Sequence, residues 1–271
     1  MARPGENKAI RKRPRDGHAR TEPRESTASV VYGLGPVLEA LRSDSRKVER
    51  VAIADGAREH RLTEIIDLCR EQSIPFARVS RERLERDLDR GANHQGVVAF
   101  TSASAYAEIE DVIDASENPL ILILDGVEDP RNLGAILRAV ECAGADGVII
   151  PERRAVGLTE TVAKSSAGAI EHVKVAKVNN LNRIIEDLKA RNIWVVGASG
   201  DATTTIYDWD WRQPTALVLG SEGSGLHRLV AENCDLLVKV PMYGKIDSLN
   251  VSVAAGVILF EAKRQRSSGL E

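Results

Sequence analysis

A chain of 271 residues, 43 % of them apolar, is long enough for two ordinary domains that each bury a hydrophobic core. Its three cysteines are single and widely separated, without a C-x-x-C pair or a cluster of histidines, which argues against a disulfide scaffold and a structural zinc site. No apolar run approaches the roughly 20 residues that span a bilayer, and the first residues lack the apolar segment of a signal peptide. We therefore expect a cytoplasmic protein with no membrane segment and no bound metal ion.

The net charge of −3 is distributed unevenly along the chain. Residues 1–28 hold eight Lys and Arg against four Asp and Glu, which leaves 29 basic and 36 acidic residues for the rest. This segment contains Pro and Gly but few apolar residues, and basic side chains gather at Arg11, Lys12 and Arg13, so we expect a disordered basic tail. Two interpretations stay open: a flexible arm that binds phosphates weakly and in a salt-dependent way, or a solvated extension.

Residues 29–102 are typical of a small α/β domain. Apolar residues at helical spacing predict an amphipathic helix over 59–72, and charges of mixed sign predict a second helix over 81–88. Short β-rich runs predict strands over 48–54, 76–79 and 96–101. Residues 103–118 show no strong pattern and are interpreted as a linker to the next domain.

From residue 119 to 267 strands and helices alternate. The segment opens with the continuous apolar run 120–124, which is typical of a strand covered on both faces. The elements predicted after it are helix 132–143, strand 147–150, helix 159–169, strand 173–178, helix 180–191, strands 193–197 and 216–219, helix 226–232, strand 236–240 and helix 249–265. Such alternation predicts an α/β fold with a mostly parallel sheet between two layers of helices.

Three polar stretches, the first two of which contain glycine, stand far apart in this second domain: 132–138, 220–225 and 248–252. Loops at the carboxyl ends of strands converge on one crevice in an open α/β sheet, so these stretches predict a single ligand pocket. The turn 220–225 has neither the Rossmann nor the P-loop spacing. Its glycines would let a backbone approach a flat ligand closely, although a tight turn without a ligand is the alternative.

These stretches resemble the motifs of the SpoU/TrmH superfamily of RNA ribose 2′-O-methyltransferases. The matches are N-x-G-x-x-x-R at 132–138, G-S-E-G-x-G at 220–225 and P-M-x-G-x-x-x-S-L-N-V-S at 241–252. Two further stretches, K-S-S-A-G-A at 164–169 and N-H-Q-G-V at 93–97, are similar to the branch that methylates a guanosine in 23S ribosomal RNA. The resemblance covers nearly the whole chain after residue 28.

The resemblance implies a smaller N-terminal domain with an L30e-like RNA-binding fold over 29–102. It implies a SPOUT-type trefoil knot in the C-terminal domain over 119–267, a rare exception to normal chain topology. Members of the family pair through the knotted domain, so a homodimer is expected. Ribosomal RNA is the expected partner.

S-adenosylmethionine is the implied cofactor, bound in the knot by main chain of three residues and by their neighbours. The residues expected to bind it are Gly197, Ala198, Leu219, Gly220, Gly225, Val240, Met242 and Leu249. Apolar walls and strand-end backbone suit an adenine without charged side chains.

Arg138 is the residue that the resemblance assigns to catalysis. Methyl transfer needs an aligned nucleophile and removal of the hydroxyl proton. A guanidinium stays protonated, so an orienting and charge-stabilising role stands beside the role of a base. The side chains expected to hold the arginine or the ribose are those of Asn132, Glu222, Ser248 and Asn250. For Asn132 and Ser248 an N-cap role at a helix start is the alternative.

His94 and Gln95 are expected to contact RNA together with Arg11, Lys12 and Arg13, with a turn-stabilising role as the alternative for His94. Histidines 60, 172 and 227 are expected to be solvated. Residues 207–211 alternate aromatic and acidic side chains. This pattern favours an edge segment whose aromatic side chains pack against the protein; a platform that stacks an RNA base is the alternative.

Two other functions stay open at this point. A methyltransferase of tRNA ribose or an antibiotic-resistance enzyme acting on ribosomal RNA would use the same machinery. A non-catalytic RNA-binding factor of ribosome assembly could keep the fold, although the complete set of Asn132, Arg138, Glu222 and Asn250 disfavours it.

Overall fold

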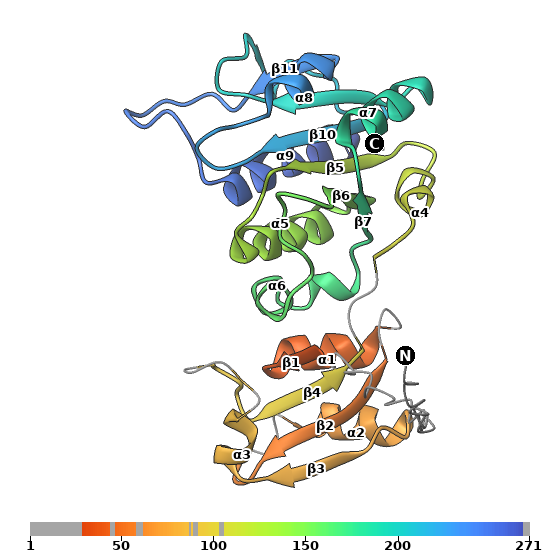
Figure 1. Cartoon of the computed structure of the whole chain (residues 1–271), viewed down its shortest axis with the longest axis vertical. Helices are drawn as coiled ribbons and strands as arrows, with labels where there is room; N and C mark the ends of the chain where they lie inside the picture. The colour runs from red at the N-terminus through yellow and green to blue at the C-terminus, as the bar shows by residue number, and fades with distance from the viewer. Residues whose placement is uncertain are drawn as a thin grey trace, which may run out of the picture.

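The structure is a computed structural model that describes residues 29–43, 47–57, 62–86, 88, 92–102 and 106–267. The basic tail with Arg11, Lys12 and Arg13 lies outside the described residues. The described chain forms a smaller N-terminal body and a larger C-terminal body, stacked along the long axis of the molecule (Figure 1). Among these residues, none of the helices combines the length and the apolar character that a membrane crossing requires.

The N-terminal body is built on a four-stranded sheet in the order β1-β4-β2-β3. Strand β4 (Val97–Thr101) is antiparallel to β1 (Ser29–Tyr32) and to β2 (Val48–Ala54), and β2 is parallel to β3 (Phe76–Val79). The predicted strands 48–54 and 76–79 are confirmed, and β4 begins one residue later than predicted. All five residues of β4 are buried because it is an inner strand covered on both faces.

Helices cover both faces of this sheet. Helices α1 (Leu34–Arg42) and α2 (Thr63–Glu71) share one core cluster, while α3 (Arg81–Glu85) packs Leu84 into the cluster on the other face. Helix α2 begins later than the predicted residue 59, and α3 ends three residues before the predicted residue 88.

The C-terminal body contains a seven-stranded sheet in the order β7-β6-β5-β10-β8-β11-β9, in which every pairing is parallel. Its strands are β5 (Leu120–Asp125), β6 (Gly147–Pro151), β7 (Val175–Val178), β8 (Trp194–Ala198), β9 (Thr204–Thr205), β10 (Thr215–Gly220) and β11 (Leu236–Lys239). The α/β class with a parallel sheet is therefore confirmed. The trefoil knot stays a prediction.

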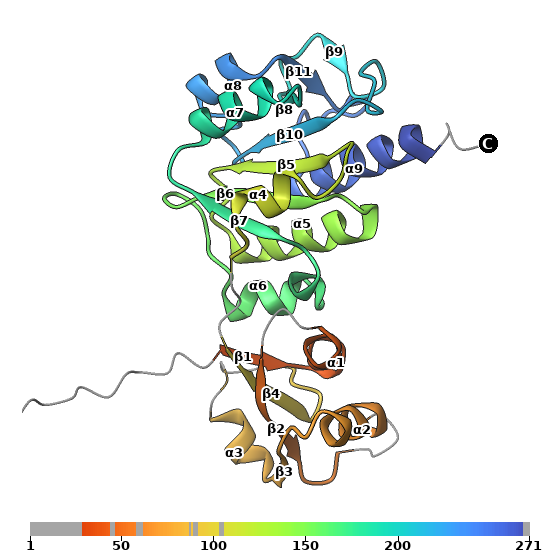
Figure 2. The same cartoon turned by 90° about the vertical axis from the view of Figure 1, so that its right-hand side faces the viewer.

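Two layers of helices enclose the sheet (Figure 2). Helices α5 (Pro130–Ala143), α6 (Glu160–Ser165) and α9 (Val251–Ser267) share a core cluster with one face. Helices α4 (Ile109–Ile113), α7 (Leu181–Ala190) and α8 (Arg228–Asn233) contribute to the cluster on the other face. The inner strand β5 is fully buried, as its continuous apolar run predicts.

The segment interpreted as a linker contains a regular element. Helix α4 buries Val112 and Ile113, and Ala107 forms a parallel bridge with Ala176 at the end of the sheet. The sequence gives little sign of α4 because five residues with two acidic side chains are too short for a helical period.

The predicted helix 159–169 is divided into two pieces. Helix α6 ends at Ser165, and the 3-10 turn η2 (Ala169–Glu171) follows. Gly168 between them has φ 97°, and a Cβ there would lie 2.7 Å from Glu39 Cγ. This glycine precedes the 3-10 turn and lets the N-terminal body approach closely.

Polar contacts join the two bodies at this turn. His172 Nε2 lies 2.8 Å from Glu39 Oε2, the Ser43 hydroxyl donates to Glu171 O at 2.9 Å, and Val30 N donates to Glu160 Oε1 at 3.2 Å. His172 is exposed, as expected, and Glu39 of α1 orients its ring.

The chain order of the large sheet creates a topological switch point. Strands β5 and β10 are neighbours, and the chain leaves β5 toward β6 and β7 on one side but reaches β8 and β11 on the other side of β10. In open α/β sheets, ligands bind at the carboxyl ends of the strands beside such a point. Gly220, which pairs with Asp125 in the register of β10 and β5, lies at this position.

Candidate active site

A cavity of about 460 Å³ opens at the carboxyl ends of β8, β10 and β11. This volume lies in the range of small-molecule sites. We call it the first cavity, and its lining is formed by Ala198, Ser199, Gly200, Leu219, Gly220, Ser221, Gly225, Val238, Lys239, Val240, Pro241, Met242, Asp247, Ser248, Leu249, Val251, Ala254 and Ile258.

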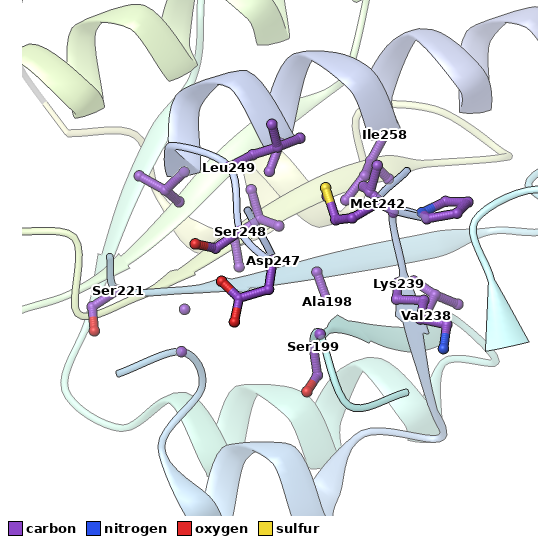
Figure 3. A pocket seen from close by; sticks show the side chains of 18 residues that line it. Ala198, Ser199, Ser221, Val238, Lys239, Met242, Asp247, Ser248, Leu249 and Ile258 are labelled. Atoms are coloured by element: carbon purple, nitrogen blue, oxygen red, sulfur yellow. The ribbon is translucent and has the colours of Figure 1, made fainter. Parts of the chain in front are cut away.

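The walls of the first cavity are apolar over most of the strand ends and α9, with a few polar groups. Figure 3 shows the side-chain oxygens of Ser221, Asp247 and Ser248 toward one end, and Met242 with Lys239 toward the other. An apolar slot with a small number of placed polar groups can hold a flat heterocycle and orient a polar attachment.

Seven of the eight residues expected to bind the cofactor line the first cavity, and so does Ser248. The seven are Ala198, Leu219, Gly220, Gly225, Val240, Met242 and Leu249. Ser199, Ser221 and Asp247 line it as well, although the sequence analysis does not name them. Ser221 and Asp247 lie within the motifs 220–225 and 241–252, and Ser199 directly follows Ala198.

Gly197 is the one expected cofactor residue that does not line the cavity. A Cβ at this position would lie 2.7 Å from Leu237 Cδ2 and 2.9 Å from Cys234 Sγ, so Gly197 faces α8 rather than the first cavity. Burial, reinforced by the nearby charge of Asp235, raises the pKa of the Cys234 thiol to about 12, and the thiol is therefore a neutral packing group.

The turn after β10 folds back against the strand end. Ser221 N donates to Gly225 O at 3.1 Å, and Gly225 N donates to Ser221 O at 3.0 Å. A Cβ on Gly220 would lie 2.1 Å from the carbonyl carbon of Gly225 and 2.3 Å from Leu226 N. Only glycine fits at position 220, so the motif is both a tight turn and a wall of the first cavity.

The three polar stretches meet through their side chains. Asn132 Nδ2 on α5 donates to Glu222 Oε2 at 3.0 Å, and Asn250 Nδ2 donates to Asn132 Oδ1 at 3.0 Å and to Glu222 Oε1 at 3.3 Å. We call Asn132, Glu222 and Asn250 the polar triad. The triad joins residues up to 118 positions apart in the sequence. The three polar stretches therefore converge, as the sequence analysis predicts.

The N-cap alternative is wrong for Asn132 and for Ser248. Asp129 caps α5 by accepting from Arg131 N at 2.7 Å, so Asn132 lies inside the first turn. Asn250 precedes α9 and accepts from Ser252 N at 2.9 Å. The amide of Asn132 serves the polar triad instead of a cap, and Ser248 lines the first cavity.

Arg138 lies apart from the polar triad within one chain. It stands six residues after Asn132 on α5, which is about 9 Å along the helix axis and on a different side of it. Its side chain is exposed and lines neither the first cavity nor the second cavity described next.

The second cavity, of about 360 Å³, adjoins the first one at Ser221 and Val251. Asn132 and Glu222 of the polar triad line it, together with Gly126, Val127, Glu128, Asp129, Arg154, Ser224 and His227. His227 is exposed, as expected, and its Nδ1 also lies 2.8 Å from Asp125 Oδ1, which holds the ring in place.

The motif N-H-Q-G in the N-terminal body forms a tight turn. His94 is buried and its Nδ1 accepts from Gly96 N at 3.1 Å, which supports the turn-stabilising interpretation. Gln95, with φ 52°, accepts from Leu34 N at 2.9 Å and so holds the start of α1. Both residues line a hollow of about 240 Å³, and an RNA contact there stays a prediction.

Two aromatic side chains of the segment 207–211 pack against the protein, as expected for an edge segment. Trp211 is fully buried and donates to Ile206 O at 2.7 Å, and Trp209 meets Trp194 edge to face with ring centroids 5.3 Å apart. Tyr207 remains exposed. Within the part of the chain that the structure describes, no group of three or more His, Cys, Asp and Glu side chains is arranged to hold a metal ion.

The ligand-sized cavity and the polar triad lie together at the carboxyl end of a parallel α/β sheet. This arrangement is typical of α/β enzymes that bind a small molecule at that end of the sheet. Residues 119–260 match the SpoU rRNA Methylase family, and residues 30–107 match the domain described as RNA 2′-O ribose methyltransferase substrate binding. The chain belongs to the SpoU rRNA methylase family.

Individual relatives agree over most of the chain. A Bacillus subtilis relative named "Putative TrmH family tRNA/rRNA methyltransferase YacO" is 47 % identical over 88 % of this chain and 96 % of its own length. The 23S rRNA (guanosine-2′-O-)-methyltransferase RlmB of Ralstonia nicotianae is 42 % identical over 89 % of this chain and 98 % of its own. The SpoU methyltransferase AviRb of Streptomyces viridochromogenes, solved with AdoMet, superposes with a TM-score of 0.76 at 26 % identity, covering 89 % of this chain and 91 % of that one.

Proposed function

We propose that this protein transfers the methyl group of S-adenosylmethionine to the 2′-oxygen of a guanosine ribose in 23S ribosomal RNA. The observation that carries the proposal is the pair of adjoining cavities, which meet at Ser221 and Val251 with the polar triad beside them. Relatives such as RlmB of Ralstonia nicotianae carry this activity in their names. In this proposal residues 29–102 bind RNA and residues 119–267 perform the chemistry.

The lining of the first cavity fits S-adenosylmethionine. Apolar side chains such as Leu249 and Ile258 suit the faces of adenine, and the main chain of Gly220 and Gly225 at the cavity wall can meet its edge. Asp247 and Ser248 supply oxygens for hydroxyl or ammonium groups. When bound, this cofactor supplies an electrophilic methyl group on a sulfonium.

The second cavity is the proposed place of the acceptor nucleotide. Its polar lining includes two members of the polar triad, and Glu222 accepts hydrogen bonds there from both asparagines. The bonds fix the amide orientations before RNA arrives, so the ribose hydroxyl meets groups that need no reorganisation. The chain thereby orients the nucleophile beside the boundary of the two cavities.

A homodimer through the C-terminal body is part of the proposal. Helix α9 buries Ala255, Ile258 and other residues against the sheet, yet Val253, Val257 and Phe260 are 50 %, 37 % and 51 % exposed at spacings of four and three. We call these three the α9 stripe. A helix that is apolar on its outer side as well is expected to be covered.

A second copy would also give Arg138 a place in the reaction. Arg138 lies outside both cavities of its own chain, so it can act only where another molecule comes close to it. Helix α5, which carries it, belongs to the same layer as α9. Pairing through this layer is the arrangement we propose for an arginine that orients the acceptor and stabilises charge.

The exchange Val257→Asp is expected to weaken self-association by at least about 100-fold, because a carboxylate would be buried at the contact. Analytical ultracentrifugation over a range of concentrations measures it. Leu229→Asp on α8 is the matched control, since Leu229 is 54 % exposed but lies on the other face of the sheet. Equal association of both variants and the unchanged protein would exclude the α9 stripe as the contact.

Mapping of 2′-O-methyl groups in cells with and without the gene tests the function. We expect one guanosine of 23S ribosomal RNA to lose its methyl group and to regain it with the unchanged gene. A loss confined to tRNA would favour the tRNA enzyme, and an unchanged methylation pattern with an assembly defect would favour the non-catalytic factor. Either outcome overturns the proposal.

A further inference from the structure

His227 is held in one orientation by a buried carboxylate. Its main-chain N donates to Asp125 Oδ2 at 2.7 Å, and its Nδ1 lies 2.8 Å from Asp125 Oδ1. Asp125 is the last residue of β5 and is only 5 % exposed. A carboxylate accepts at both oxygens, so Nδ1 carries a hydrogen, and in the neutral ring Nε2 is the nitrogen with the free lone pair.

The free edge of the ring is the one that can meet a ligand. Nδ1 faces Asp125, and a Cβ on Gly126 would lie 3.3 Å from Cε1 of His227. Gly126 has φ 88°, a conformation that favours glycine, and this lets the strand end pack against the ring. The side chain of His227 is still 46 % exposed, so Nε2 and Cδ2 form its open edge.

The surroundings of that edge belong to the second cavity. His227 lines it together with Asn132 and Glu222 of the polar triad. Arg154 lines it too, with φ 59°, and a non-glycine residue in this region is a strained conformation of the kind that gathers at functional sites. A histidine with a fixed tautomer in a polar cavity is suited to accept a hydrogen bond from a hydroxyl or a base N–H group.

We propose that His227 binds the acceptor nucleotide of the RNA through Nε2, with Asp125 as the residue that positions its ring. This inference rests on the proposed function, because it takes the second cavity as the acceptor site. No motif of the sequence contains His227. It adds a substrate-binding residue to the polar triad and gives the buried Asp125 a role in the site.

The exchange His227→Asn separates a substrate contact from a structural role. The Asn amide N–H group reaches the place of Nδ1 and keeps the bond to Asp125, but no atom replaces Nε2. We expect the KM for RNA to rise about 3- to 10-fold, as for the loss of one hydrogen bond. The affinity for S-adenosylmethionine and the thermal midpoint are expected to stay within experimental error.

Two further variants complete the experiment. His227→Ala removes both contacts and should raise the KM at least as much. Arg228→Ala is the matched control, since Arg228 pairs with Glu232 at 2.6 Å and lines neither cavity, so its KM should equal that of the unchanged protein. Methyl transfer to an RNA fragment provides kcat and KM, and calorimetry provides the cofactor affinity.

A KM for His227→Asn equal to that of the unchanged protein, with His227→Ala impaired or unstable, would show a structural role and overturn the inference alone. An unchanged protein that binds S-adenosylmethionine but methylates no ribosomal RNA would overturn the proposed function and this inference with it. The two failures are distinguishable because the unchanged protein is measured first.

Discussion

Gly220→Ala is expected to weaken S-adenosylmethionine binding by at least about 100-fold, which corresponds to about 2.8 kcal/mol. The added methyl group would lie 2.1 to 2.3 Å from three backbone atoms of Gly225 and Leu226, and backbone cannot yield as a flexible side chain does. The turn 220–226 must move, and with it a wall of the first cavity and Glu222. Isothermal titration calorimetry measures the affinity, and circular dichroism verifies the fold.

The control for this variant lies outside both cavities. Gly35 on α1 lines neither of them, and a Cβ there would have no heavy atom within 4 Å, so Gly35→Ala should leave the affinity unchanged. If Gly220→Ala bound the cofactor as tightly as Gly35→Ala does, the first cavity would not be the cofactor site.

Arg138→Ala is expected to lower the rate of methyl transfer by at least about 100-fold, a size typical for the loss of a group that stabilises a developing charge. Cofactor affinity should stay within about twofold because Arg138 does not line the first cavity. Single-turnover transfer to RNA measures the rate. Arg138→Lys should recover only part of it, since an ammonium lacks the planar fork of the guanidinium.

Arg131→Ala is the comparison for this experiment. Arg131 is an exposed arginine in the first turn of α5 and lines neither cavity. Its removal tests whether any loss of positive charge from α5 slows the reaction. Full activity of Arg138→Ala, or an equal loss in both variants, would remove Arg138 from the proposed mechanism.

The larger sheet could be predicted because its strands are apolar on both faces. The apolar run 120–124 lies in β5, as predicted, and the alternation of strands and helices corresponds to a parallel sheet between two layers of helices. The elements without a prediction are short or weakly patterned: β1, α1, α4 and β9. The N-cap residue of α1 is Gly33, which has no side chain to cap the helix, so the usual start signal is missing.

The convergence of the three loops could be predicted from their places at strand ends, but the direction of individual residues could not be taken from the motif alone. Side chains alternate along a strand, so Ala198 and Gly197 point to opposite faces of β8. Ala198 lines the first cavity and Gly197 packs toward α8. Strand alternation was the signal that could have separated them.

The contact of His227 with Asp125 had no sequence signal. The two residues are 102 positions apart, and neither belongs to a motif identified in the sequence. Their distance is set by the register of β5 and β10, which places Asp125 opposite Gly220. Side-chain contacts that depend on such a register follow from tertiary structure.

Helix α9 contributes both to the wall of the first cavity and to the outer surface of the C-terminal body. Ala254 and Ile258 line the first cavity, while the outward side of the same turns carries the α9 stripe. In the proposed dimer, a shift of this helix on ligand binding would alter the contact between the two chains, and thermodynamic linkage makes the effect mutual. Cofactor affinity should then vary with protein concentration through the range where the chains assemble.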